Sequence, residues 1–227
     1  MKDDYHIDLE KYSLDEFKIE LLESEIIPSR KILKEEINER FKILEDNGIG
    51  NLQELRDSLK NPKKAREFGV KSGLPEKYLL ILLREVNSYT PNPVNLEKFL
   101  GVKKETINKL KSAGIKNTAH LFKIAKTPED REKLAAELEI HNAEILELTK
   151  LTDLTRIKWI GPVFARLFYD SSTDTARKVS DADAHHLYKQ LVKINNAKGY
   201  TRAKFIESDV ELAIKVSKMV PKVIEYL

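Results

Sequence analysis

The residues with the clearest chemical potential are two adjacent histidines that follow two aspartates. The run Asp181-x-Asp183-Ala184-His185-His186 combines imidazole and carboxylate groups, both of which ligate metals. Adjacent residues of a helix point about 100° apart, whereas helical metal sites place their histidines four residues apart. We therefore interpret His185 and His186 as surface residues and expect no metal site.

No other set of side chains supplies the parts of an enzyme. The sequence contains no G-x-x-x-x-G-K-[ST] loop, no G-x-G-x-x-G turn and no G-x-S-x-G elbow, which are the phosphate-binding and nucleophile-positioning elements of common nucleotide-dependent enzymes and hydrolases. His6, His120 and His141 are scattered, without a triad pattern. The absence of cysteine excludes thiol nucleophiles and Cys-ligated metal sites and fits a reducing compartment. We expect a non-enzymatic protein without a cofactor.

The formal charge of +3, from 40 basic and 37 acidic residues, conceals alternating blocks. Residues 1–27 carry −6, residues 96–126 carry +6, residues 127–153 carry −5 and residues 154–227 carry +5. Such blocks are typical either of solvated helix faces or of surfaces for a charged partner, and both interpretations stay open here. The longest apolar run, residues 78–83, is too short to span a bilayer, so we expect a cytoplasmic protein that contacts no membrane.

Helix signals recur along the whole chain. Ser13-x-x-Glu16 and Ser208-x-x-Glu211 are capping-box patterns, and Thr127-Pro128 opens a further predicted helix. Apolar residues follow the helical period, and no segment alternates with period two. We predict an all-α fold without a significant β-sheet, interrupted by the two prolines of Thr90-Pro91-Asn92-Pro93-Val94.

An internal repeat organises these helices. A shift of 66 residues places Leu44 on Leu110, Gly48 on Gly114 and Leu55 on Leu121, and apolar positions continue to coincide beyond them. A shorter third copy appears with a shift of 58, which places Gly114 on Ser172. Gly48 and Gly114 each follow a predicted helix, so we interpret them as structural turns, left-handed C-caps between two helices.

Two further glycine turns lie upstream of these corners. They are Leu100-Gly101-Val102 and Ile160-Gly161-Pro162-Val163-Phe164-Ala165, each flanked by apolar residues at helical spacing. The second turn in particular resembles the hairpin of the helix-hairpin-helix superfamily. From about Pro28 onward the chain resembles an uncharacterised bacterial family that carries tandem helix-hairpin-helix units.

The resemblance implies sequence-independent binding of duplex nucleic acid, with hairpin N–H groups on phosphates and, in some members, a monovalent cation on hairpin carbonyls. Phe99 and Trp159 replace the first glycine of the usual hairpin, and we interpret Trp159 as a core residue. The first repeat has Glu35 and Glu36 at its hairpin position, which marks that hairpin as structural. The candidate binding residues combine hairpin backbone with nearby cations: Gly101, Val102, Lys103, Lys104, Arg156, Lys158, Gly161, Val163 and Arg166.

An alternative function is a protein-interaction scaffold, in which the hairpins are structural and the charge blocks pair with a partner. In both cases we expect the same organisation along the chain. It comprises an acidic N-terminal segment (1–27), a first helix-hairpin-helix-like unit (28–89), a Pro-containing linker (90–95), a second unit (96–153), a degenerate third unit (154–198) and a C-terminal helix (199–227).

Overall fold

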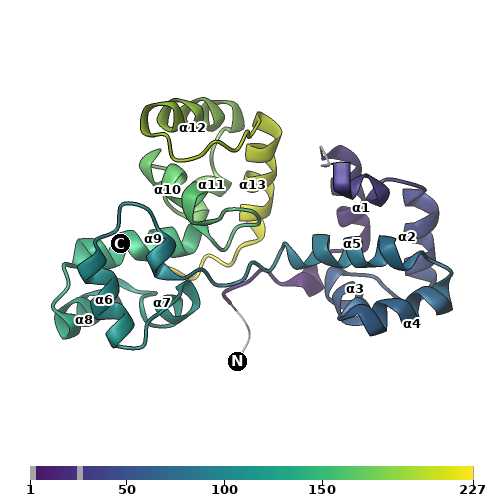
Figure 1. Cartoon of the computed structure of the whole chain (residues 1–227), viewed down its shortest axis with the longest axis horizontal. Coiled ribbons are helices and arrows are strands. Elements are labelled where there is room, and N and C mark those ends of the chain that lie inside the picture. The colour runs from purple at the N-terminus through teal and green to yellow at the C-terminus, as the bar shows by residue number, and fades with distance from the viewer. Residues whose placement is uncertain (1–3, 25–27, 227) are drawn as a thin grey trace. The chain divides into compact units, whose positions relative to one another are not determined.

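The computed structural model, which describes residues 4–24 and 28–226, is all-helical (Figure 1), as the sequence predicts. Its helices form two compact bodies. Of the described residues, 8–24 and 28–90 make up the N-terminal body, and 4–7 join 91–226 in the C-terminal body. The division after Thr90 falls where two prolines interrupt helix formation. Within the described part of the predicted acidic segment, residues 4–7 belong to the C-terminal body and residues 8–24 to the N-terminal body.

The N-terminal body consists of η1 (Leu9–Lys11), α1 (Leu14–Glu23), η2 (Pro28–Leu33), α2 (Ile37–Asp46), α3 (Leu52–Leu59), α4 (Pro62–Ser72) and α5 (Glu76–Asn87), where η denotes a 3₁₀ helix. The C-terminal body consists of η3 (Leu96–Lys98), α6 (Lys104–Ser112), α7 (Thr118–Ile124), α8 (Pro128–Leu138), α9 (Asn142–Leu154), α10 (Pro162–Asp170), α11 (Ala176–Ser180), α12 (Ala184–Lys198) and α13 (Glu207–Met219). Within the described residues, β-type pairing is limited to two isolated bridges.

Two of the predicted helix starts are confirmed and one is wrong. The Ser13 side chain accepts the Glu16 N–H at the start of α1, and Thr127 does the same for Asp130 at the start of α8. Ser208 is not an N-cap, because α13 already begins at Glu207. There the carboxylate of Asp209 accepts the backbone N–H of Ile206 at 2.9 Å and stabilises an earlier start.

The shift of 66 residues that aligns the sequence also aligns the helices. It carries both ends of α4 onto both ends of α8, and the first residues of α3 and α5 onto those of α7 and α9. Asn51 and Asn117 are equivalent N-caps, and each side chain accepts the N–H three residues ahead. The paired core residues Leu44 and Leu110, like Leu55 and Leu121, are fully buried. The repeated sequence therefore encodes a repeated arrangement of four helices, α2–α5 and α6–α9.

A third group of helices follows the same order. A shift of 58 residues carries both ends of α6 onto both ends of α10, and the start of α7 onto the start of α11. Figure 1 shows α10 to α13 gathered in one part of the C-terminal body. The last helix packs against α11 and α12, and its residues Val210, Ala213 and Ile214 are buried. Helix α13 therefore completes the third group and does not stand apart from it.

The turn after the first helix of each group has a left-handed backbone. Gly48 and Gly114 have φ of +83° and +84°, and Ser172 has φ of +65° at the equivalent position. Glycine adopts this conformation at little cost, whereas a residue with a Cβ is strained there. The third group therefore retains the corner although its sequence has lost the glycine.

The N-terminal body buries charged groups as well as apolar side chains. The carboxylate of Glu20 lies in the interior and accepts hydrogen bonds from the hydroxyl groups of Tyr12 and Tyr89. Burial is the main cause of the raised pKa of the Tyr12 hydroxyl, and the charge on Glu20 adds to it. Glu85, also buried, forms an ion pair with Arg30. These acids therefore stabilise the interior of the body and are not part of its charged surface.

The corner glycine predicts a measurable stability difference. We expect Gly114→Ala to lower the free energy of unfolding of the C-terminal body by about 1 kcal/mol, because the strain of a left-handed φ is added. No heavy atom lies within 4 Å of the position of the new Cβ. Urea unfolding followed by the fluorescence of the only tryptophan, Trp159, measures the change.

The matched control is Gly161→Ala, where space is also free but φ is −80°. We expect this variant to change stability much less. Ser172→Gly should act in the opposite direction to Gly114→Ala, because it relieves strain at the equivalent corner. Equal losses for the two alanine variants would contradict the assignment of the strain to the left-handed corner.

Candidate nucleic-acid interface

The first hairpin is an exposed turn between η3 and α6. Gly101 has φ of +77°, and Val102, half-buried, leads into Lys103, the N-cap of α6. A Cβ on Gly101 would lie 3.4 Å from the guanidinium carbon of Arg166. Glycine is therefore favoured at this position for its left-handed backbone, while an added Cβ would only touch the arginine from α10.

The two lysines of this hairpin differ in how far they are neutralised. Lys103 forms an ion pair with Glu144, which also accepts a hydrogen bond from Thr106. The hydrogen bond from Lys103 is the first cause of the lowered pKa of Glu144, followed by that from Thr106. Lys104 is exposed on the first turn of α6. The hairpin thus offers a phosphate one exposed lysine and one that is already paired.

The second hairpin differs from the first in its backbone. The shift of 58 residues places Gly101 on Trp159, and Trp159 is indeed the left-handed residue, with φ of +66°. Gly161 has an ordinary φ of −80° and is the N-cap of α10, followed by Pro162 and the half-buried Val163. By backbone conformation, Trp159 and not Gly161 is the equivalent of Gly101. Trp159, predicted to be a core residue, is 49% exposed.

Arg156 is a structural residue and cannot contact phosphate, because it is completely buried. Its Nη1 pairs with Asp153 Oδ1 at 2.6 Å, and its Nε donates to the carbonyl oxygen of Tyr5 at 2.8 Å. Its Nη2 donates to the carbonyl oxygens of Asp4 at 2.9 Å and Pro221 at 2.8 Å. One guanidinium thus connects the end of α9 to the first and the last described segments of the C-terminal body.

Lys158 and Arg166, also predicted to bind phosphate, are buried as well. The ammonium group of Lys158 lies 4.5 Å from the ring centroid of Trp159. Arg166 donates from Nε to the carbonyl oxygen of Leu100 at 2.7 Å and forms an ion pair with Glu147. The cations that made the second hairpin a candidate site therefore connect and support the hairpins from inside the body.

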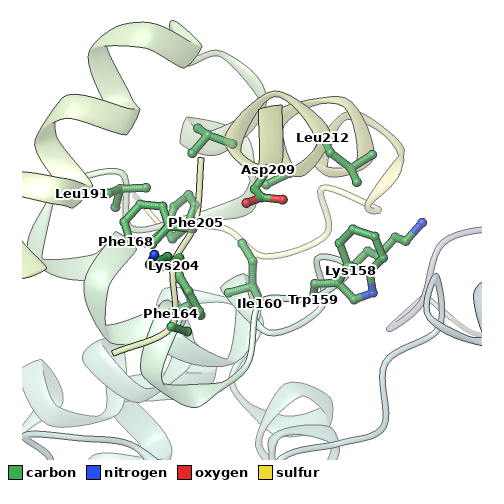
Figure 2. Close-up of a pocket in the computed structure, with 13 residues that line it drawn as sticks. Lys158, Trp159, Ile160, Phe164, Phe168, Leu191, Lys204, Phe205, Asp209 and Leu212 are labelled. Carbon is green, nitrogen blue, oxygen red and sulfur yellow. The ribbon is translucent and has the colours of Figure 1, made fainter. Parts of the chain in front are cut away.

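An apolar pocket of about 190 Å³ opens beside the second hairpin (Figure 2). Its aromatic walls come from the hairpin, from α10 and from the segment before α13. The Phe164 and Phe205 rings meet edge to face with centroids 5.5 Å apart. In Figure 2 the carboxylate of Asp209 lies between Phe205 and Leu212. The pocket is lined mainly by Trp159, Ile160, Phe164, Phe168, Phe205 and Leu212, with Lys158, Lys204 and Asp209 as its charged residues.

A family model described as Domain of unknown function (DUF4332) matches residues 100–218, just over half of the 227 residues. The chain belongs to the DUF4332 family. The predicted membership of an uncharacterised domain family is thus confirmed. No curated protein and no solved structure matches the chain. The DUF4332 region runs from the first hairpin into α13, so it contains both hairpins and the pocket but not the related helices α2–α5.

A cationic segment that was not among the predicted site residues lies inside the DUF4332 region, at residues 184–206. This segment has five lysines and arginines and no aspartate or glutamate, and all five cations are exposed. None of them has an ion-pair partner among the residues that the structure describes. Counting charge over the whole of residues 154–227 concealed the segment, because the acids of that block lie on either side of it. The five cations are Lys189, Lys193, Lys198, Arg202 and Lys204.

Local structure fixes where these cations lie. Leu187 and Leu191 are buried on the inner side of α12, which leaves Lys189 and Lys193, four residues apart, on an exposed side. After the left-handed Gly199, the side chain of Asn195 bonds the following loop twice, at the N–H and the carbonyl oxygen of Thr201, both at 3.0 Å. The loop that carries Arg202 and Lys204 is therefore held against the end of α12.

The lysines of α6–α9 contrast with the cationic segment. Five of them form ion pairs: Lys103 with Glu144, Lys109 with Glu105, Lys111 with Glu97, Lys126 with Asp4, and Lys150 with Asp174. Two of the acids that pair with lysines of residues 96–126, Glu144 and Asp4, lie outside that block, so pairing with them offsets two of its six net charges. The cationic segment differs from the first hairpin in that none of its described cations forms an ion pair, whereas Lys103 of the hairpin does.

The histidine pair of the DUF4332 region lies on exposed positions of α12. Nδ1 of His185 lies 3.0 Å from the carboxylate of Glu207, and Nε2 of His186 lies 3.0 Å from the side-chain amide of Gln190. Across residues 4–24 and 28–226, no group of three or more His, Cys, Asp or Glu side chains is arranged to bind a metal. No helix of the described chain is both long and apolar enough to cross a membrane.

The burial of Arg156 predicts that it stabilises the C-terminal body. We expect Arg156→Met to lower the free energy of unfolding by about 3–5 kcal/mol, because it leaves the buried carboxylate of Asp153 without its cation. Lys104→Met, which removes an exposed cation, should change stability by no more than about 0.5 kcal/mol. Urea unfolding monitored by Trp159 fluorescence compares the two, and similar small losses would show that Arg156 has no such role.

A pH dependence follows from Tyr226, whose hydroxyl donates to Asp153 Oδ2 at 2.8 Å. Burial, then the charge on Asp153, raise the pKa of Tyr226 well above its ordinary value. In the unfolded chain the phenol ionises near pH 10, whereas in the folded body it stays protonated, so stability is full below pH 10 and falls as the pH rises.

We expect Tyr226→Phe to weaken this alkaline loss by up to about 1.4 kcal/mol per pH unit above pH 10. Urea unfolding at several values between neutral pH and pH 11 measures the slope for both proteins. Tyr188→Phe is a suitable control, because Tyr188 packs edge to face on Phe205, outside this network. An unchanged slope in Tyr226→Phe would contradict the assignment.

Proposed function

We propose that the chain is a non-enzymatic protein that binds the phosphate backbone of nucleic acid without sequence preference. The observation that carries the proposal is the cationic segment, residues 184–206, with five exposed cations and no acidic residue. Each lysine or arginine that neutralises a phosphate releases a counterion condensed on the nucleic acid, and this release drives binding. Duplex nucleic acid is the reference ligand of this proposal.

The first hairpin contributes a second contact in this proposal. Gly101 and Val102 present an accessible backbone, and Lys103 and Lys104 stand at the start of α6. The second hairpin contributes no cation of its own, because Arg156, Lys158 and Arg166 are buried. Binding is therefore concentrated on α12 and the loop that follows it.

The finer features of the resemblance belong to the same proposal. The turns before α6 and α10 are helix-hairpin-helix elements, and the chain acts in a bacterial cytoplasm without a cofactor. The proposal does not include a monovalent cation bound at the first hairpin. The carbonyl oxygen of Leu100 accepts a hydrogen bond from Arg166, and the positive guanidinium at that position repels a metal cation.

Binding of a random-sequence duplex at two salt concentrations tests the proposal. Fluorescence polarisation should show affinity falling steeply between about 50 and 200 mM salt. We expect Lys198→Glu with Arg202→Glu to lower affinity at low salt and to reduce the slope of log K against log salt by about 2, because two phosphate contacts are lost.

The matched control is Lys64→Glu with Lys71→Glu, which makes the same change of charge on exposed positions of α4 in the N-terminal body. This pair should leave the salt slope nearly unchanged. Lys103→Glu with Lys104→Glu measures the hairpin contribution, which we expect to be smaller than that of the cationic segment. Absence of duplex binding at 50 mM salt would overturn the proposal and favour the protein-scaffold alternative, tested by co-purification after nuclease treatment.

A further inference from the structure

We infer that the pocket beside Trp159 receives an unpaired base, so that the preferred ligand is single-stranded nucleic acid. This inference rests on the proposed function, because the phosphates that accompany the base bind the cationic segment. It assigns the class of nucleic acid and the part of the ligand that enters the fold.

The shape and lining of the pocket suit a flat aromatic group. Trp159, Phe164 and Phe205 contribute rings to its walls, and its volume is about 190 Å³. Figure 2 shows Trp159 at one end of the pocket and Phe205 near the other. Bases stack on such rings irrespective of sequence, since every base has a π-face.

The backbone conformation and the exposure of Trp159 indicate that its ring has a role other than filling the core. The residue is left-handed, with φ of +66°, at the position where the first hairpin has Gly101, and its side chain is 49% exposed. A bulky residue in this conformation is strained. The backbone of the second hairpin is thus strained at a residue whose large apolar side chain is half exposed. Strained backbone conformations of this kind cluster at binding sites.

The charges around the pocket match a nucleotide. Lys204 lines the pocket, and Arg202 and Lys198 precede it on the same loop and on the end of α12. A nucleotide has its negative charge on the phosphate and its apolar surface on the base, so the base can enter while the phosphate stays beside these cations. The cationic segment continues along α12, where Lys189 and Lys193 can bind the phosphates of neighbouring nucleotides.

The carboxylate of Asp209 favours a nucleotide base in the pocket over a fatty acid. One of its carboxylate oxygens accepts the Ile206 N–H at 2.9 Å, and the group lies within the lining of the pocket. A carboxylate accepts hydrogen bonds from the amino groups of cytosine and adenine. It repels the carboxylate of a fatty acid and gains nothing from a hydrocarbon chain, so the mixed wall favours a base over an acyl chain.

Entry of a base requires that it be unpaired. In a duplex each base is stacked and hydrogen-bonded to its partner, and extruding it costs a few kcal/mol. A single strand avoids most of that cost. The pocket therefore adds affinity for single strands to the backbone binding that both ligands share.

Trp159 provides the direct measurement, because it is the only tryptophan of the 227 residues. We titrate the full chain with a mixed-sequence DNA strand of about 12 nucleotides and with the duplex of the same length at low salt. Single-stranded DNA should bind at least several-fold more tightly and quench the tryptophan fluorescence by stacking, whereas the duplex should leave the fluorescence nearly unchanged. Equal affinities without quenching would overturn the inference and leave the proposed backbone binding intact.

Trp159→Gly tests the role of the ring without threatening the fold, because glycine relieves the left-handed strain at this position. We expect the ratio of single-strand to duplex affinity, measured by polarisation, to fall about tenfold, as loss of one stacking contact predicts. Trp159→Phe keeps a flat ring and should restore most of the ratio. A thermal melt of each variant verifies folding.

The remaining outcomes separate this inference from the proposed function. If Lys198→Glu with Arg202→Glu weakens both ligands but Trp159→Gly leaves their ratio unchanged, the backbone proposal stands and the base pocket is wrong. If neither ligand binds at 50 mM salt, both are wrong. Quenching by oleate in place of single-stranded DNA would identify the pocket as an acyl-chain site.

Discussion

The C-terminal body depends on one buried ion pair, between Asp153 and Arg156 at the end of α9. Asp153 accepts the guanidinium on one oxygen, and the backbone N–H of Ala176 and the hydroxyl group of Tyr226 on the other. Arg156 binds carbonyl oxygens before Ile7 and after α13. Burying two charges costs desolvation free energy. Here that cost is offset, because almost every polar atom of the pair has a hydrogen-bond partner. Four separate segments of the chain are therefore connected through this one pair of residues.

The repeat shows how different sequences encode one backbone. At the corner after the first helix of each group, glycine occupies the left-handed position twice and Ser172 occupies it once. At the C-cap of the third helix, Gly73, Glu139 and Gly199 are all left-handed. The shared requirement is a left-handed backbone at each turn. A residue with a Cβ, such as Ser172 or Glu139, is strained there, and the packing of neighbouring helices compensates for this strain.

Sequence patterns determine much of this fold because they act locally. The spacing of Leu44, Leu55 and their repeats predicts the helices, and capping residues such as Ser13 and Thr127 predict where helices begin. The candidate site was less predictable. Whether an arginine is a phosphate ligand or a buried connection depends on segments far away in the sequence, such as Asp4 and Pro221 for Arg156. Charge counted along the chain also cannot show which lysines are paired, although the acid-free run of residues 184–206 was visible in principle.

The connectivity of the two bodies has a consequence for biosynthesis. The N-terminal body is continuous in sequence, whereas the C-terminal body takes residues from before and after it. On the ribosome, residues 8–90 can fold as soon as they emerge. Arg156, in contrast, cannot complete its bonds until Pro221 has left the exit tunnel, long after Asp4 was made. The set of bonds that joins Asp4 and Tyr5 to Arg156 and Pro221 therefore stays incomplete until Pro221 has been synthesised, and the N-terminal body can fold before the C-terminal body is complete.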